Sequence, residues 1–230
     1  MKICTLCPRM CAVDRKSGER GICGQTTEIK VARAALHFWE EPCISGEMGS
    51  GAVFFSGCAL HCVFCQNENI ANGTAGKVIS TERLGKIFLE LQEKGANNIN
   101  LVTPGQFVPQ IIKAVELARN QNLKIPIVYN TSSYENVDTI RSLEGIVDIY
   151  LPDFKYFDTA LSAKYSHAPD YPAVAKAVIA EMVRQTGAAV FENGEDSLMK
   201  RGTIVRHLIL PGCTRSEERR VGKECRSRWS

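Results

Sequence analysis

Apolar and polar positions follow a regular pattern through the middle of this 230-residue chain, from about Gly51 to Cys213. Short apolar runs, typical of buried strands, are separated by longer segments in which apolar residues recur every three or four positions, as on one face of a helix. The pattern predicts strands at 52–55, 99–102, 125–129, 146–151 and 203–210, and helices that include 84–91, 108–115 and 171–185. Ser80 or Thr81 is a suitable N-cap for the first helix, and Gly95 a suitable stop.

The predicted strands are apolar along most of their length rather than at alternate residues. Strands of this kind are buried on both faces, which indicates parallel strands covered by helices and an α/β fold. A doubly wound sheet and a complete or partial (β/α) barrel both fit this pattern, and periodicity does not separate them.

The chain divides into four parts by composition. Residues 1–24 form a cysteine-rich head, 25–50 a connecting segment, 51–213 the core, and 214–230 a polar, arginine-rich tail. The tail resembles a peptide that recurs at the ends of fragmentary gene models, so we expect it to be non-native and the core to be truncated near Cys213. The alternative is a disordered basic tail.

Charge and hydropathy narrow the class of protein. The tail holds six of the 28 basic and three of the 25 acidic residues, which leaves 22 of each sign in the rest of the chain. A neutral body argues against a nucleic-acid partner, which normally needs a basic face. No apolar run approaches the ~18 residues of a membrane span, and the N-terminus lacks the apolar stretch of a signal peptide. We therefore expect a cytoplasmic protein without a membrane partner.

Ten cysteines are many for a chain of this length, and three of them lie within eight residues. Cys58, Cys62 and Cys65 follow the first predicted strand of the core, so one loop brings three thiols together. Thiolates favour iron–sulfur clusters, zinc or copper. A cubane cluster held by only three thiolates keeps one iron open for a further ligand. The alternatives are an iron–sulfur electron carrier with a fourth ligand and a zinc-stabilised interaction module in which His61 or a remote residue completes the site.

Four more cysteines, Cys4, Cys7, Cys11 and Cys23, lie in the head. This segment has little apolar periodicity of its own, and metal binding would supply the folding free energy that it lacks. Their spacing differs from that of a standard zinc ribbon. We expect a structural zinc or a second cluster here; the alternative is a set of reduced free thiols.

The spacing C-x₃-C-x₂-C, with Phe64 immediately before the third cysteine, resembles the signature of radical S-adenosylmethionine enzymes. Within that superfamily, residues 1–213 are most similar to pyruvate formate-lyase activating enzymes and their uncharacterised relatives. The resemblance implies a partial (β/α)₆ barrel, here truncated before its last strand, with the cluster loop after the first strand. It also implies a [4Fe–4S] cluster whose open iron binds S-adenosylmethionine next to Phe64.

Three strand ends extend the resemblance. Asp153 and Lys155 match a D-x-K motif, in which the lysine meets the carboxylate of S-adenosylmethionine and the aspartate lies on its ribose side. Asn130 matches a ribose-contacting position, and Arg206 begins an R-x₅-P-G motif whose arginine approaches the same carboxylate. Taken alone, each motif is equally compatible with surface charge, a turn or a helix cap.

One strand end departs from the family pattern. Family members usually carry Gly-Gly-Glu after the second strand, where it receives the amino group of the cofactor. Here the strand is followed by Thr103-Pro104-Gly105-Gln106. We expect Thr103 and nearby carbonyl groups to replace that contact, and the departure weakens the transfer of the activating enzyme's own substrate.

The resemblance thus implies reductive cleavage of S-adenosylmethionine to a 5′-deoxyadenosyl radical, which abstracts hydrogen from a substrate. Its default reaction is installation of a glycyl radical on a partner enzyme, with a flavodoxin- or ferredoxin-type protein as the electron donor. Modification of a small molecule or a peptide is the next expectation.

Overall fold

The computed structural model describes residues 3–193 and 197–210. The strands are β1 (Ile29–His37), β2 (Ser50–Phe55), β3 (Lys77–Ile79), β4 (Ile99–Val102), β5 (Ile127–Thr131), β6 (Ile149–Phe154), β7 (Val190–Phe191), β8 (Met199–Thr203) and β9 (Arg206–His207). The helices are α1 (Pro42–Ser45), α2 (Glu68–Ala71), α3 (Thr81–Glu93), α4 (Val108–Arg119), α5 (Val137–Arg141), α6 (Thr159–Ser166) and α7 (Tyr171–Thr186), with a 3₁₀ turn η1 at Gly105–Phe107.

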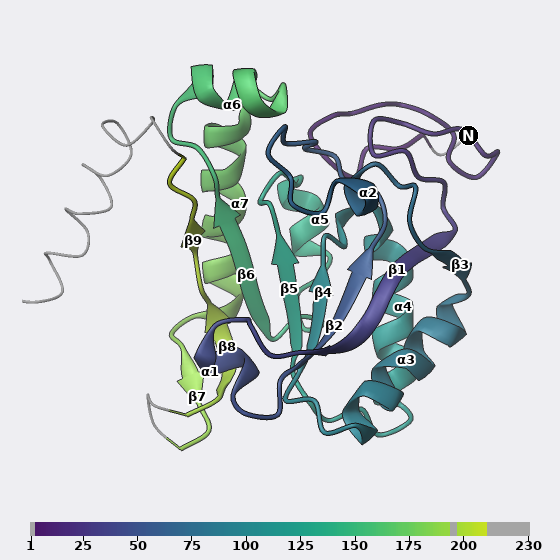
Figure 1. The fold of residues 1–230 in the computed structure, drawn as a ribbon, viewed down its shortest axis with the longest axis vertical. Coiled ribbons are helices and arrows are strands. Elements are labelled where there is room, and N and C mark those ends of the chain that lie inside the picture. Colours follow the sequence, from purple (N-terminus) through teal and green to yellow (C-terminus); the bar gives the residue numbers. More distant parts are fainter. Residues whose placement is uncertain (1–2, 194–196, 211–230) are drawn as a thin grey trace, which may run out of the picture.

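The described strands form one mixed sheet in the order β3-β1-β2-β4-β5-β6-β8-β7, and β9 pairs with the end of β6. Strands β2, β4, β5, β6 and β8 run parallel, whereas β1, β3 and β7 are antiparallel to their neighbours. The edge strands β3 and β7 do not pair with each other, so the sheet stays open. This arrangement confirms the α/β class and the partial barrel (Figure 1).

Helices α3, α4, α5 and α7 lie behind the sheet in Figure 1 and bury one of its faces. Along β2, Val53 and Phe55 belong to the main hydrophobic core, which they share with Leu84 and Phe88 of α3 and Ile111 of α4. All five are fully excluded from solvent. Helix α3 begins where its sequence predicts, because the side chain of its N-cap, Ser80, accepts a hydrogen bond from the amide of Arg83.

The opposite face of the sheet is the interior of the partial barrel. At its lower end, Ile44 of α1 packs with Val128, Ile149, Leu151 and Met199 and closes the base. At its upper end, Phe54, Val102 and Asn130 lie in register across three parallel strands. The strand ends above this base are therefore the part of the interior that is free to bind a ligand.

The predicted strand at 203–210 is wrong. Strand β8 ends at Thr203 after pairing with the start of β6, and the two-residue β9 resumes the pairing at Asp153 and Phe154, at the end of β6. Val205, between the two strands, has 48% of its surface exposed. The β-branched run thus does not form one continuous buried strand: β8 and β9 follow β6 in the same register, but the ladder is interrupted between Thr203 and Arg206.

The sequence pattern also missed several elements. Strand β1 crosses the segment 25–50, which was predicted as a connection, and α1 follows it; β3 pairs with β1 at the sheet edge. Helix α6 is short and has hardly any amphipathic pattern, so periodicity gave no signal for it.

The predicted tail 214–230 and the truncation point near Cys213 lie outside the described residues. In the part of the chain that the structure describes, no helix has both the length and the apolar composition needed to cross a membrane.

Candidate functional site

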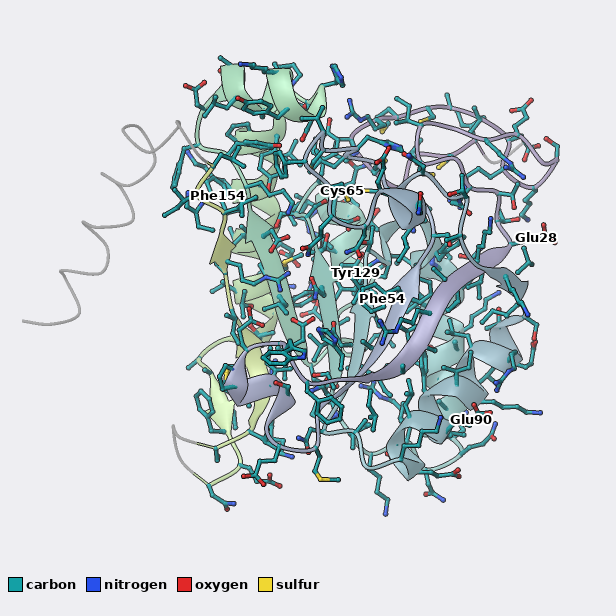
Figure 2. All side chains as sticks on the ribbon, in the orientation of Figure 1. Glu28, Phe54, Cys65, Glu90, Tyr129 and Phe154 are labelled. Atoms are coloured by element: carbon teal, nitrogen blue, oxygen red, sulfur yellow. The ribbon has the colours of Figure 1, made fainter. Side chains whose placement is uncertain are left out.

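A cleft of about 760 Å³ opens at the carboxyl ends of the parallel strands. Its volume lies within the range of small-molecule and cofactor sites. It is lined by every residue that the sequence predicts for the cluster and its cofactor, namely Cys58, Cys62, Phe64, Cys65, Thr103, Asn130, Asp153, Lys155 and Arg206. Figure 2 shows Cys65 above the strands and Phe54 and Tyr129 on the sheet below it. Residues from four strands and one loop thus meet at one place.

The cysteine loop leaves β2 through Gly57, whose φ of +87° suits a residue without a Cβ. Two contacts attach the loop to the barrel. The side-chain amide of Gln106 lies 2.9 Å from the carbonyl oxygens of Ser56 and Gly57, and the amide of Gly57 donates to the carbonyl of Ile70 in α2. Gln106 belongs to the segment that replaces Gly-Gly-Glu in this chain. Its side chain binds the backbone from which the cysteine loop extends.

The three thiols of the loop have different surroundings. Burial raises the pKa of the Cys58 thiol, although the backbone amides of His61 and Leu60 act in the opposite direction. The Sγ of Cys62 accepts a hydrogen bond from Ser166 Oγ at 3.1 Å. The amide of Cys65 donates to the carbonyl of Cys62, which closes a tight turn between these two ligands. Hydrogen bonds thus fix the backbone after Cys58, the sulfur of Cys62 and the turn that ends at Cys65.

Phe64 lies in the aromatic cluster behind this loop. Its ring packs edge-on against Tyr156 and Tyr165, with ring centroids 6.2 Å and 6.3 Å apart. Tyr156 and Tyr171, also in contact, are fully buried. Because Phe64 both lines the cleft and packs on these rings, it separates the cysteines from solvent on this side.

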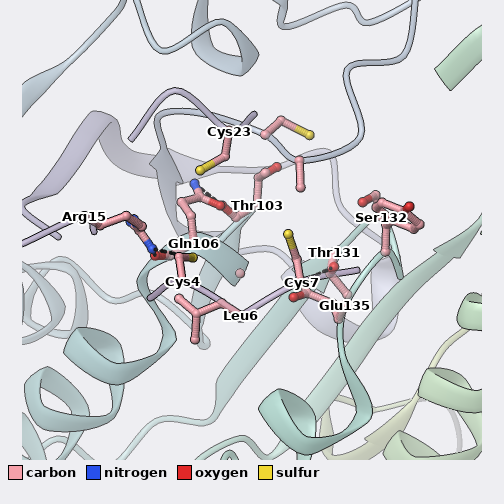
Figure 3. A pocket seen from close by; sticks show the side chains of 14 residues that line it. Cys4, Leu6, Cys7, Arg15, Cys23, Thr103, Gln106, Thr131, Ser132 and Glu135 are labelled. Carbon is pink, nitrogen blue, oxygen red and sulfur yellow. Dashed lines mark hydrogen bonds between the residues drawn. The ribbon is translucent and has the colours of Figure 1, made fainter. Parts of the chain in front are cut away.

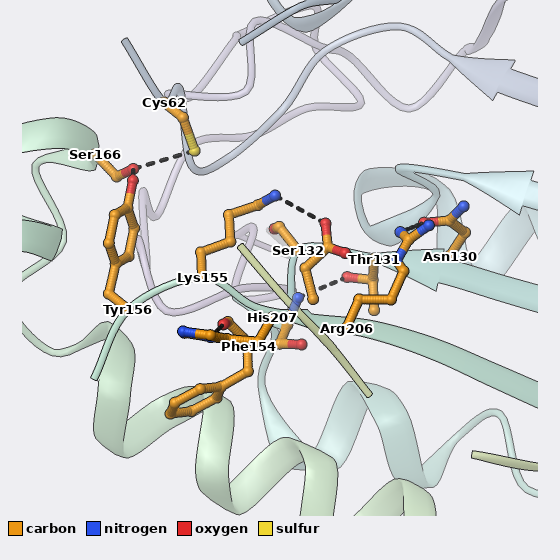
Figure 4. A network of polar contacts seen from close by, with 12 residues as sticks. Cys62, Asn130, Thr131, Ser132, Phe154, Lys155, Tyr156, Ser166, Arg206 and His207 are labelled. Atoms are coloured by element: carbon orange, nitrogen blue, oxygen red, sulfur yellow. Dashed lines mark hydrogen bonds and ion pairs between the residues drawn. The ribbon is translucent and has the colours of Figure 1, made fainter. Parts of the chain in front are cut away.

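The polar side chains of the strand ends form one connected network (Figure 4). Asp153 accepts from Lys155 Nζ and from Arg206 Nε, each at 2.8 Å. Arg206 Nη2 also donates to Asn130 Oδ1 at 2.7 Å, and Arg206 Nη1 forms an ion pair with Glu40 at 3.4 Å. Burial raises the pKa of Glu40, which Arg206 partly offsets. The network presents two cations and two carboxylates to the cleft, a set suited to a zwitterionic ligand.

Thr103 ends β4 with a φ of +56°, an unusual conformation for a threonine. Its amide donates to the carbonyl of Asn130, and its own carbonyl accepts from the side chain of Gln106. This strained turn directs Thr103 into the cleft, as the sequence predicts, but its carbonyl is already occupied by Gln106.

The head covers the outer side of the cysteine loop. Cys4, Cys7 and Cys23 line a small cavity of about 30 Å³, which also touches Cys58 and Glu135 (Figure 3). Burial raises the pKa of Cys7 to about 12 and raises that of Cys23, so both are neutral thiols at pH 7 in the absence of a metal. Cys11 does not line this cavity, and its Sγ accepts from the amide of Ile22.

Within residues 3–193 and 197–210, no three or more histidine, cysteine, aspartate or glutamate side chains are arranged to hold a single metal ion. The predicted zinc at Cys4, Cys7, Cys11 and Cys23 thus gains no support. A second cluster there gains none either, because Cys11 does not line the cavity that the other three share. A site for a single ion is not the relevant criterion for Cys58, Cys62 and Cys65. A four-iron cluster binds each thiolate at a different iron, so its cysteine sulfurs lie farther apart than those around one ion. Three thiols at one mouth of a large cleft fit such a cluster.

Several residues at the site were not found from the sequence. Arg9, in the head, donates to the carbonyls of Ala59 and Leu60 in the cysteine loop and of Ser166 at the end of α6. Ser166 in turn contacts Cys62. These contacts join segments up to 157 residues apart, so periodicity and local motifs carry no signal for them. The one local signal for Arg9 was its place in the C-x-L-C-P-R-x-C pattern of the head cysteines.

Comparison with known proteins identifies the family to which this chain belongs. The sequence profile of the Radical SAM superfamily matches residues 52–217, nearly three quarters of the chain. An uncharacterised protein of Methanocaldococcus jannaschii is 27% identical over 217 residues, which cover 91% of this chain and 57% of the relative. The chain therefore spans little more than half of the length of that relative. Because the matched segment contains the cysteine loop and all the strand ends of the cleft, the chain belongs to the radical SAM superfamily, whose members use a [4Fe–4S] cluster and S-adenosylmethionine.

Proposed function

We propose that Cys58, Cys62 and Cys65 hold a [4Fe–4S] cluster and that the cleft beside it binds S-adenosylmethionine for radical hydrogen abstraction. The observation that carries this proposal is that one 760 Å³ cleft is lined by the three thiols and by the charged strand ends. When bound and reduced, the cluster supplies the electron that cleaves the sulfonium of S-adenosylmethionine. The residues of the chain bind, orient and enclose these groups.

The charged network supports a role for each of several side chains in this proposal. Lys155 and Arg206 supply positive charge for the carboxylate of the cofactor, and Asp153, which lies between them, accepts hydrogen bonds from ribose hydroxyls. Asn130 offers both a donor and an acceptor at the same edge of the sheet. In the free protein these groups satisfy one another, so binding exchanges internal ion pairs for contacts with the zwitterion.

The apolar side of the site protects the chemistry. Phe64, Leu60 and Phe54 line the cleft between the cysteine loop and the strand ends. They exclude water from the region in which a carbon radical would otherwise react with competing groups. Thr103 and the carbonyl groups at the end of β4 would meet the amino group of the cofactor in place of Gly-Gly-Glu.

The test is anaerobic reconstitution with iron and sulfide, followed by EPR of the reduced protein with and without S-adenosylmethionine, and chromatography for 5′-deoxyadenosine. A [4Fe–4S]⁺ signal that shifts on addition of the cofactor, and that a Cys62→Ala variant loses, supports the proposal. Cys43→Ala is the matched control, because Cys43 lies outside the cleft at α1. A cluster signal indifferent to S-adenosylmethionine indicates an electron carrier, and stoichiometric zinc without a cluster indicates an interaction module; either result overturns the proposal.

We further propose that the substrate is a glycyl residue of a partner enzyme, and that a flavodoxin- or ferredoxin-type protein delivers the electron. The support is the similarity of the Asp153–Lys155 and Arg206 motifs to those of pyruvate formate-lyase activating enzymes. Thr103 at the place of Gly-Gly-Glu weighs against it. Incubation of the reduced protein with S-adenosylmethionine and pyruvate formate-lyase as the probe would give a glycyl-radical EPR doublet. Turnover of S-adenosylmethionine without that doublet would leave the radical activity intact and exclude this substrate.

A further inference from the structure

Helix α6 ends directly behind the cysteine loop. Ser166, its last residue, is fully buried, and its Oγ lies 3.1 Å from the Sγ of Cys62. The phenolic oxygen of Tyr156, equally buried, lies 2.7 Å from the same Ser166 Oγ (Figure 4). A buried chain of two hydroxyl groups thus ends on the sulfur of one predicted cluster ligand.

The direction of this chain follows from the number of available protons. A serine hydroxyl has one hydrogen to donate and lone pairs to accept with, and a thiolate bound to iron only accepts. Once Cys62 is a ligand, Ser166 must therefore donate to its sulfur, and Tyr156 must donate to Ser166. Consecutive hydrogen bonds of this kind polarise one another and become stronger.

Arg9 holds the end of α6 against the loop. Its guanidinium donates to the carbonyls of Ser166 at 2.8 Å and His167 at 2.6 Å, and to that of Ala59 at 2.9 Å. The amide of Val63 adds a direct bond from the loop to the carbonyl of Tyr165, also at 2.9 Å. The distance between Ser166 and Cys62 is thus set by contacts on both sides of the loop rather than by one flexible side chain.

We propose that Ser166 is a positioning residue that raises the reduction potential of the cluster through its hydrogen bond to Cys62, with Tyr156 as its donor and Arg9 as its support. This inference rests on the proposed function, because it needs a cluster at Cys62. Reduction adds one electron, supplied by an external reductant, and the added negative charge is shared with the ligand sulfurs. A hydrogen bond to sulfur stabilises the reduced form more than the oxidised form, and such bonds are among the determinants of cluster potentials.

The experiment is a mediated redox titration of the reconstituted protein with titanium(III) citrate, followed by EPR, for wild type, Ser166→Ala and Tyr156→Phe. For Ser166→Ala we expect the reduced-to-oxidised ratio at a fixed solution potential to fall about tenfold, which is ~59 mV for a one-electron couple. Tyr156→Phe keeps the ring and its contacts with Phe64, and we expect a smaller shift in the same direction. Ser166→Thr keeps the hydroxyl and should restore most of the wild-type potential.

Ser162→Ala is the matched control. Ser162 is equally buried on the same helix, but its hydroxyl donates to the carbonyl of Thr159, within α6. Iron content, measured in parallel, should be the same in all variants. Wild-type potential in both Ser166→Ala and Tyr156→Phe overturns the inference and leaves the proposed function standing, as does an equal shift in Ser162→Ala. If Ser166→Ala does not fold, an unshifted Tyr156→Phe overturns the inference. Absence of a cluster from the wild-type protein overturns both proposals.

Discussion

Glu135 is a buried carboxyl whose replacement by glutamine should change how stability depends on pH. Its Oε1 accepts hydrogen bonds from Thr131 Oγ1 at 2.8 Å and from Tyr129 OH at 3.2 Å. Its other oxygen lies so close to η1 that a Cβ added at Gly105 would be 2.5 Å away. Glutamine has nearly the same shape and keeps an oxygen for both donors, so Glu135→Gln removes the charge with little change in packing.

The magnitude follows from the environment of this carboxyl. Burial raises the pKa of Glu135 from 4.5 to about 7, and the hydrogen bonds from Thr131 and Tyr129 only partly oppose this. Between these pH values the folded state binds more protons than the unfolded state, so the free energy of unfolding falls as the pH rises. A pKa difference of one is worth about 1.4 kcal/mol, so the loss reaches about 3 kcal/mol above pH 7. The glutamine variant does not suffer this loss.

The assay is anaerobic denaturant unfolding of the cluster-free protein in the presence of a thiol reductant, between pH 5 and pH 8. We expect the stability of Glu135→Gln relative to wild type to rise by about 2.5 kcal/mol across this range. Glu116→Gln, on the exposed side of α4, controls for the loss of one negative charge. A stability difference for Glu135→Gln that is constant from pH 5 to pH 8 would refute the reasoning, whatever its sign.

Three further substitutions test other parts of the structure. Arg9→Lys keeps the charge but loses the planar fork that reaches the carbonyls of Ala59 and Ser166; we expect at least a twofold loss of bound iron after reconstitution, and full occupancy would contradict this. Gly57→Ala places a Cβ against the carbonyl of Cys23 at a φ of +87°, so iron content should fall further. Phe88→Ala empties a fully buried position of α3 and should cost about 3–5 kcal/mol of unfolding free energy in urea, with values below 1 kcal/mol counting against the core described here.

The central part of the fold was predictable because its information is local. Strand β4 has the predicted bounds, and α3, α4 and α7 extend their predicted segments by a few residues at most at each end. The residues that form the apolar face and the caps of each of these helices lie close together in the sequence. Strand β1 was missed because Lys30 and Arg33 interrupt its apolar residues, so it shows no continuous apolar run. The strand expected at 203–210 failed for the opposite reason, since its apolar residues are not buried together.

The candidate site divides in the same way. Residues that belong to short motifs, such as Cys58, Asp153 and Lys155, were found, and the cleft brings them together. Whether they bind the cluster and the cofactor stays a prediction. Glu40 was missed because its role depends on an ion pair with Arg206, 166 residues away in the sequence. The spacing of the head cysteines predicted a metal, but spacing does not show how four thiols are oriented once the head packs against the barrel.

The attachment of the cysteine loop also has a consequence for biosynthesis. Cys62 meets Ser166, which follows it by 104 residues, and Arg9 bonds the carbonyls of Ala59 in the loop and of Ser166. On a ribosome that adds about 5–20 residues per second, the thiols emerge roughly 5–20 seconds before α6 exists to cover them. During that interval no residue of α6 is present to contact the nascent loop, so the hydrogen bond between Ser166 and Cys62 is one of the last contacts of the loop to form.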